Sequence, residues 1–173
     1  MAQPDHLNVI ERKIIDNIRT GTYTSGSVGS TATAWDNGDV TVFGQFPETE
    51  DVEYPCIIVE MTANGIETQF MGRSMGSGEI GELYGVSFRF HIVVDRDSTV
   101  TVNGVGYKQR RLLNYLMLAT ANVIMDCDFT STDTEVEERH YTGFQDMGYN
   151  PDLEIWAAMA SMIVVFKNDR PPG

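Results

Sequence analysis

The chain has 173 residues, of which 42% are hydrophobic and 10% aromatic, and its net charge is −13. This composition fits one globular domain over residues 1–173 and excludes wholesale disorder. The excess of carboxylates would repel polyanions, so binding to nucleic acid by neutralising phosphates is not expected. The sequence has no apolar run long enough for a bilayer and no signal-peptide core, and we expect a soluble, unexported protein without a membrane partner.

The acidic charge is unevenly distributed along the chain. The stretch from Gly21 to Gly72 contains no Lys or Arg, and the whole chain has only three lysines. Two explanations remain open. A high-salt host would screen the self-repulsion of an acidic protein, or the acidic surface has a function of its own. Scarce lysine together with scattered carboxylates favours the halophilic host.

The first predicted element is a helix that Asp5 can cap and that Gly21 ends. One face of this helix is marked by apolar residues at helical spacing: Leu7, Ile10, Ile14 and Ile18. Residues 21–39 contain many Ser, Thr and Gly residues, especially from Thr22 to Ala34, and are expected to form a long flexible loop.

Two strands are predicted next, at Val40–Phe43 and at Cys56–Met61. An acidic segment with Glu48, Glu50, Asp51 and Glu53 connects them. The turn dipeptide Asn64-Gly65 predicts that Ile66–Phe70 returns as the second arm of a hairpin. Residues 71–82 are rich in glycine. A flexible loop is favoured over a phosphate-binding loop, because the stretch matches no G-x-x-x-x-G-K-[ST] motif and no lysine lies near to bind a phosphate.

The strongest pattern lies in the middle of the chain. Apolar and polar residues alternate strictly from Val86 to Ile92, as in a strand with one buried face. After a small extension at Thr99–Val102, a helix is predicted over Gln109–Met125. Its apolar stripe is wide enough to pack across a sheet.

Three cations, Lys108, Arg110 and Arg111, fall in the first turns of this helix, where the helix dipole favours acidic residues. They form either a solvated face or a contact with the acidic surface of a neighbouring chain. The acidic residues Glu48, Glu50, Asp51 and Glu53 are likewise expected to contact neighbouring subunits.

The last third of the chain predicts two further strands. Glu135–Phe144 is the first, and Leu153–Phe166, apolar on both faces, is either a central strand or a buried helix. The β-branched residues at its end favour a strand. Residues 168–173 are expected to be a tail. The predicted fold class is α+β, with a mixed, mostly antiparallel sheet and an N-terminal helix and one long central helix packed on one face.

No enzyme is predicted. The histidines lie outside any spaced metal-ligand set, and the two cysteines are expected to be buried free thiols. Glu137, Glu138 and His140 are the best candidates for acid–base chemistry, but a charged strand edge explains them more simply. We therefore expect no catalytic, cofactor-binding or metal-binding residues and no cofactor, and instead a rigid core with extensions that contact neighbouring subunits.

The layout of these elements resembles the tail terminator (tail completion) proteins of long-tailed viruses and the related neck proteins of the head–tail joint. The resemblance is carried by Tyr54–Val59, Tyr84–Asp95, Lys108–Met125 and Trp156–Phe166, and it covers Ile10 to Lys167 as an order of elements. The family has no invariant motif, and the stretch from Thr22 to Ala34 is longer than expected for it.

The resemblance implies a virion protein of the tail and neck, assembled in the host cytoplasm. It would form a ring, commonly a hexamer, that caps the tail tube, joins it to the neck or connector proteins and lets viral DNA pass through an acidic lumen without specific binding. With the scarce lysine, the expected source is a tailed virus of a halophilic archaeon. The alternatives are another connector or stopper protein, a tail-tube protein, or a small-ligand-binding α+β domain.

Overall fold

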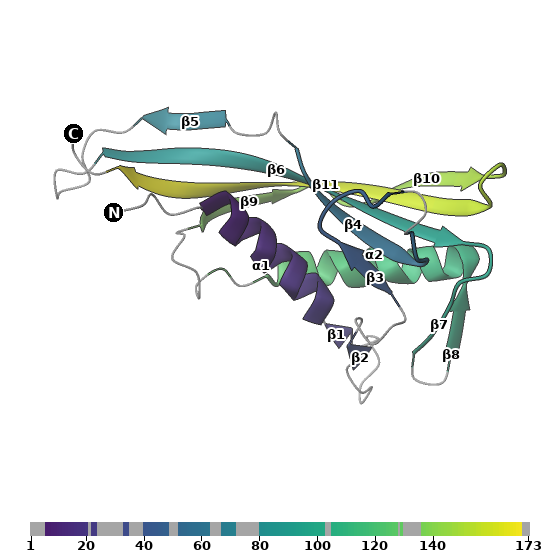
Figure 1. Cartoon of the computed structure of the whole chain (residues 1–173). Coiled ribbons are helices and arrows are strands. Elements are labelled where there is room, and N and C mark those ends of the chain that lie inside the picture. Colours follow the sequence, from purple (N-terminus) through teal and green to yellow (C-terminus); the bar gives the residue numbers. More distant parts are fainter. Residues whose placement is uncertain are drawn as a thin grey trace.

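The computed structural model describes residues 6–20, 22–23, 33–34, 40–48, 52–62, 67–71, 80–102, 105–127, 129 and 136–170. Two antiparallel strands, β6 (Ile80–Asp95) and β11 (Ile155–Arg170), form its spine, and each has 16 residues. They pair along their whole length, so that Asp95 lies opposite Ile155 and Ile80 opposite Arg170. At about 3.4 Å per residue the ladder is roughly 50 Å long, and it crosses the molecule from end to end (Figure 1).

The spine has different neighbours at its two ends, within a seven-stranded sheet. On the β6 side, β4 (Cys56–Met61) pairs with the C-terminal part of β6, and β5 (Glu67–Met71) pairs with its N-terminal part. The short strand β3 (Thr41–Phe43) continues the sheet as the parallel neighbour of β4. On the β11 side, β10 (Gln145–Asn150) and β9 (Val136–Tyr141) pair with successive stretches of the strand.

Two small antiparallel pairs lie outside this sheet. Strands β1 (Thr22–Tyr23) and β2 (Thr33–Ala34) form one, and β7 (Thr99–Val102) and β8 (Val105–Lys108) form the other. The β7–β8 hairpin leads directly into the second helix and protrudes from one end of the molecule (Figure 1).

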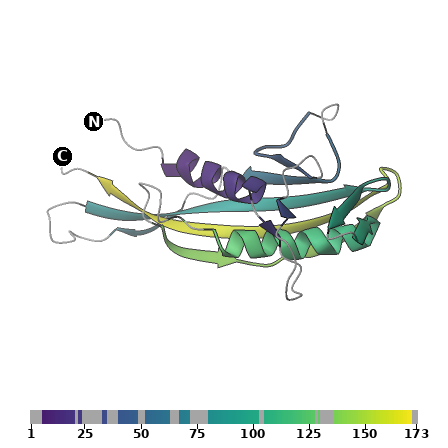
Figure 2. The same ribbon diagram turned by 90° about the horizontal axis from the view of Figure 1, so that it is seen from below.

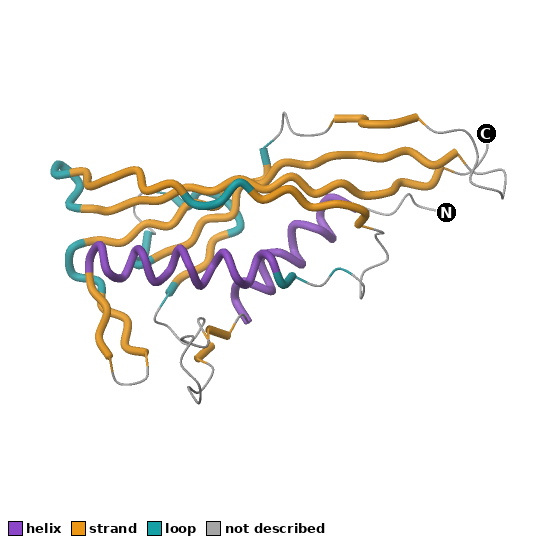
Figure 3. Tube along the Cα trace, turned by 180° about the vertical axis from the view of Figure 1, so that it is seen from behind, coloured by secondary structure: helices purple, strands orange, loops and turns teal. Residues whose placement is uncertain are grey.

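Both helices, α1 (His6–Thr20) and α2 (Gln109–Met125), lie on the same face of the sheet, as Figures 1 and 2 show. The view from behind in Figure 3 shows the same two layers. The predicted α+β class, with a mixed, mostly antiparallel sheet and two helices on one face, is confirmed.

The core lies between the sheet and the helices. Alternation on β6 produces it directly, because every second side chain from Val86 to Val94 is fully buried. Large residues of β6 lie opposite small ones of β11, Phe90 against Ala160 and Ile92 against Ala158, which keeps the layer level beneath the helices. The helices contribute their predicted apolar faces, including the buried residues Ile10, Ile14, Ile18, Leu112, Leu116 and Ala119.

Three predicted loops are partly wrong. The expected loop over 21–39 contains the strand pair β1–β2 within its described residues. The expected loop over 71–82 overlaps β5 at Met71 and β6 at residues 80–82, and the expected tail over 168–173 contains the end of β11. Residues 80–82 and 168–170 lack an apolar pattern. The two sets nevertheless pair with each other through backbone hydrogen bonds, and this pairing does not require an apolar pattern.

Strand pairing corrects three further predictions. β5 pairs with β6 and not with β4, because both edges of β4 are already occupied by β3 and β6. The strand expected at Glu135–Phe144 is present as β9 but ends at Tyr141, and a further strand, β10, that was not predicted follows after Gly143 at φ +80°. Lys108 is the last residue of β8 and precedes α2 instead of lying in its first turn. Asp5 and Asn64-Gly65 lie outside the described residues.

Arg139 of β9 closes the C-terminal end of α2. Its Nη1 donates to the carbonyl oxygen of Met125 at 3.2 Å and to that of Cys127 at 2.6 Å. Its guanidinium also lies 5.7 Å from the centroid of the Phe129 ring. The last carbonyls of a helix lack helical partners and carry the negative end of the helix dipole, so a cation there stabilises both.

We expect Arg139→Gln to lower the free energy of unfolding by about 1–2 kcal/mol, because it removes charged hydrogen bonds to the end of α2. Urea denaturation measures the change. Arg89→Gln is the matched control, because Arg89 is half exposed and its ion pair with Glu60 is long, at 4.0 Å. A change below about 0.5 kcal/mol is expected there. Equal losses in the two variants would contradict the capping role.

The hydroxyl of Thr120 in α2 is fully buried and has no hydrogen-bond partner among the described residues. Thr120→Val keeps the shape of the side chain and should raise the free energy of unfolding by about 1 kcal/mol. Thr142→Val is the control of opposite sign, because the Thr142 hydroxyl donates to the carbonyl of Ser161 at 3.0 Å and accepts from its amide at 3.1 Å. Thermal and urea unfolding of both variants check the two signs.

Candidate functional site

One end of the molecule brings together two segments that are separate in the sequence, the stretch from the end of β6 to the start of α2 and the β10–β11 turn. The start of α2, the β7–β8 hairpin and the β10–β11 turn all lie there (Figures 1 and 2). Two ion pairs connect them: Arg110 Nη2 is 3.0 Å from Asp146 Oδ2, and Arg96 Nη1 is 3.0 Å from Glu154 Oε1. The end is therefore fixed by side chains as well as by the sheet.

Large apolar side chains are exposed at this end. Met147 and Leu153 are 62% and 65% exposed, and Tyr149 is also exposed while its ring packs 4.5 Å from that of Trp156. Local backbone features put the first two there. Met147 is the extra residue of a β-bulge, followed by Gly148 at φ +87°, and the amide of Leu153 donates to the side chain of Asn150 within the turn.

The three cations singled out by the sequence lie at the same end but in different environments. Arg110 forms an ion pair with Asp146 of the same chain. The guanidinium carbon of Arg111 lies 4.8 Å from the centroid of the Tyr107 ring. Lys108 is exposed and makes no side-chain cap for α2, whose first turn contains no acidic residue. We define the helix-end surface as Lys108, Arg111, Met147, Tyr149 and Leu153.

A second surface is formed by the connection from β3 to β4. Phe46 and Tyr54 are 56% and 40% exposed, and Glu48 and Glu53 are exposed beside them. Glu50 and Asp51 of the predicted acidic segment lie outside the described residues. We define the loop surface as Phe46, Glu48, Glu53 and Tyr54. It borders the β3 edge of the sheet, whereas β10 of the helix-end surface forms the opposite edge.

The loop surface is anchored on the helix-free face of the sheet. The Phe46 ring lies 4.9 Å from that of His91, and His91 Nε2 is 3.2 Å from Glu60 Oε2. Glu53 accepts a long hydrogen bond of 3.5 Å from the Thr41 hydroxyl. The polar side of β6 thus holds a loop in place, and sequence reasoning did not connect His91 with either Phe46 or Glu60.

The cysteines carry no reactive site. Cys56 and Cys127 are both free and buried. Burial, and secondarily the charge of Asp95, raises the pKa of the Cys56 thiol to about 12. A thiol with such a pKa stays protonated at neutral pH and is a poor nucleophile and metal ligand. Cys127 Sγ accepts a hydrogen bond from Asn17 Nδ2 at 3.0 Å.

The acid–base candidates are solvated. His140 Nε2 is 3.0 Å from Glu138 Oε2, but both side chains are more than 60% exposed, and Glu137 is exposed as well. Water screens such an exposed pair, and its two side chains lie outside any shielded cleft of the described residues. The prediction of a charged strand edge describes these residues as the structure places them.

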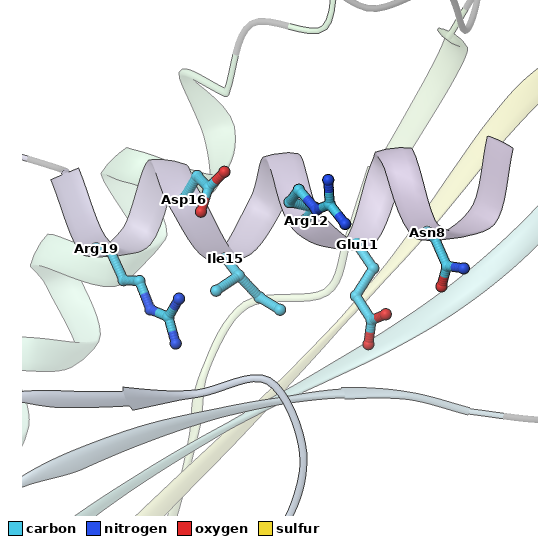
Figure 4. Close-up of a pocket in the computed structure, with 6 residues that line it drawn as sticks. All are labelled: Asn8, Glu11, Arg12, Ile15, Asp16 and Arg19. Carbon is cyan, nitrogen blue, oxygen red and sulfur yellow. The ribbon is translucent and has the colours of Figure 1, made fainter. Parts of the chain in front are cut away.

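A shallow groove of about 260 Å³ follows one side of α1 (Figure 4). Burial raises the pKa of Glu11 within it. The described lining comes from a single helix and mixes both charges: Asn8, Glu11, Arg12, Ile15, Asp16 and Arg19. Ligand sites usually gather polar groups from several elements around an apolar cavity, and this groove has neither property.

The described residues contain no group of three His, Cys, Asp or Glu side chains that could hold a metal ion. No helix in the same part of the chain is both long and apolar enough to cross a membrane. No protein-family model matches the sequence, and no curated protein matches it at a significant level.

The free energy of unfolding should decrease at alkaline pH because Cys56 is buried. The folded-state pKa of about 12 exceeds the ordinary value of 9.0, so the unfolded state loses its proton first. Stability is therefore unaffected below pH 9 and falls above it by up to about 1.4 kcal/mol per pH unit. Urea unfolding from pH about 8 to about 11 should show a steeper decline for the wild type than for Cys56→Ala. Parallel profiles would contradict the raised pKa.

Proposed function

We propose that this chain is a structural virion protein, a tail terminator whose copies form a ring that caps the tail tube and joins it to the neck. The observation that carries the proposal is the pair of unlike exposed surfaces, one at the start of α2 and the β10–β11 turn and the other on the connection from β3 to β4. One of them is cationic and apolar, and the other is acidic and aromatic. Unlike surfaces on opposite sides of a subunit favour head-to-tail assembly, which either closes into a ring or extends as a filament.

The scaffold supports this role because it is stiff along its length. The β6–β11 ladder is continuous over 16 residue pairs, and both helices cover the same face. A subunit of a closed ring must hold its two contact surfaces at a fixed angle, since small deviations add up around the ring. A sheet that runs through the whole subunit meets that requirement.

The charge of −13 supports a passive lumen. Proteins that hold DNA release counterions by pairing Lys and Arg with phosphates. A chain with 25 carboxylates and 12 cations provides few such contacts, so DNA would pass through its ring without being retained. In the same proposal the partners are the tail tube and the neck proteins, and a host that grows in high salt explains the scarce lysine.

A connector, a stopper or a tail-tube protein would use the same surfaces differently. A tube protein must also bind copies of itself above and below the ring and would form long stacks. A small-ligand-binding domain is less well supported, because the groove on α1 draws its described lining from one helix.

Purified protein should form single closed rings of uniform size, seen by electron microscopy and by mass determination in low and in molar salt. The rings should not retain duplex DNA in a mobility-shift assay at low salt, because their net charge repels it. Long stacks would favour a tube protein. A monomer in both salt conditions would contradict the ring, and tight DNA binding would contradict the passive lumen.

A further inference from the structure

We propose that the helix-end surface of one copy docks on the loop surface of the next copy, so that the ring is built from a single repeated heterologous contact. This inference rests on the proposed ring and names its interface. The occupant of each surface is a second copy of this chain, and three properties of the described residues support that assignment.

The first property is charge complementarity. Lys108 and Arg111 form no ion pair within the described part of the chain, although Arg111 contacts the ring of Tyr107. They lie at the positive end of the α2 dipole. The loop surface offers Glu48 and Glu53, and its surroundings in the sequence contain no cation from residue 21 to residue 72. Asp146 and Glu154 at the helix end are already paired with Arg110 and Arg96, while Asp152 is exposed there. The complementarity is therefore between the two unpaired cations and the two carboxylates of the loop surface.

The second property is the chemistry of the exposed apolar groups. The helix-end surface exposes Met147 and Leu153, and the loop surface exposes the aromatic rings of Phe46 and Tyr54. Methionine packs favourably on aromatic rings, and both residue types are enriched at protein interfaces. With the charges around them, the two surfaces have the apolar centre and polar rim of a docking interface.

The third property is the separation of the two surfaces within one chain. Strands β4, β6 and β11 lie between β3, which the loop surface borders, and β10 of the helix-end surface. Phe46 of the loop surface lies over His91 of β6 on the helix-free face, whereas Lys108 and Arg111 lie at the start of α2 on the other face (Figure 1). The surfaces therefore complement each other only between copies. A symmetric dimer that used the same surface twice would place cations against cations or carboxylates against carboxylates. The contact is therefore directional.

Charge-swapped variants test the pairing. Variant one is Lys108→Glu with Arg111→Glu, and variant two is Glu48→Lys with Glu53→Lys. Each alone should assemble roughly tenfold or more weakly at low salt, because like charges then face each other. An equimolar mixture should assemble again. The reversed surface of one variant meets the reversed surface of the other, and the two unchanged surfaces also meet.

Native mass spectrometry at low salt should show that the mixed rings alternate between the two variants and contain an even number of subunits. Arg12→Glu with Lys13→Glu on α1 is the control for variant one, and Glu137→Lys with Glu138→Lys on β9 is the control for variant two. Each control changes the net charge by the same amount and in the same direction as its variant, and both controls should assemble like the wild type. Circular dichroism verifies that every variant is folded, and Lys108→Glu alone, which leaves the contact of Arg111 with Tyr107 intact, should weaken assembly less.

The outcomes separate this inference from the proposed function. If the wild type forms rings and the swapped variants also assemble normally, the pairing is overturned and the ring stands. The same holds if the wild type forms rings but the mixture of variants does not assemble again. Open filaments of the wild type, lost in each variant and recovered in the mixture, overturn the terminator and keep the pairing. Equal loss in the control variants shows a general charge effect and overturns the pairing.

Discussion

The continuous pairing of β6 with β11 is the constraint on which the rest of the structure depends. Side chains alternate between the two faces of a strand, so a shift of the register by one residue would exchange the buried and the exposed sets. The strict apolar alternation from Val86 to Val94 therefore fixes the register of the whole ladder. Every other strand of the main sheet takes its place as a neighbour of these two strands, apart from β3, which pairs with β4.

The edges of the sheet favour contacts through side chains over the addition of further strands. A sheet with open edges can pair with further strands, and two edges here carry features that oppose this. Arg19 of α1 donates to the Val42 carbonyl of β3 at 3.1 Å, and β10 contains a bulge at Met147. The surfaces that remain for neighbours are the exposed side chains around the sheet edges. These are specific in charge, which an exposed backbone is not.

Elements whose side chains carry a period were predictable, and elements defined by backbone pairing alone were not. The isoleucines of α1, the alternation of β6 and the apolar stripe of α2 led directly to their elements and to the fold class. Residues 168–170 show no such pattern, since they are ordered by pairing with residues 80–82, far earlier in the chain. The same limit applied to β5, which pairs with β6 because β3 and β6 occupy both edges of β4.

The candidate surfaces were half predictable for a related reason. Charge can be counted in a sequence, so Lys108, Arg111, Glu48 and Glu53 were found, but the partner of Arg110 was not, because Asp146 reaches it only through the folding of β10. Exposure of apolar residues cannot be counted in this way. Met147 is exposed because it lies on β10, whose residues are all exposed, and Leu153 is exposed because it lies in a turn. The Pro151-Asp152 turn signal beside Leu153 was the available hint.

The burial of both thiols has a consequence for the durability of the protein. Oxidising surroundings cross-link or modify cysteines that are accessible as thiolates, and reducing surroundings keep disulfides open. Cys56 and Cys127 are both buried and neither forms a disulfide, so an oxidant in solution meets no thiol of either residue. The pattern of thiols in a folded copy would therefore be the same in reducing and in oxidising surroundings.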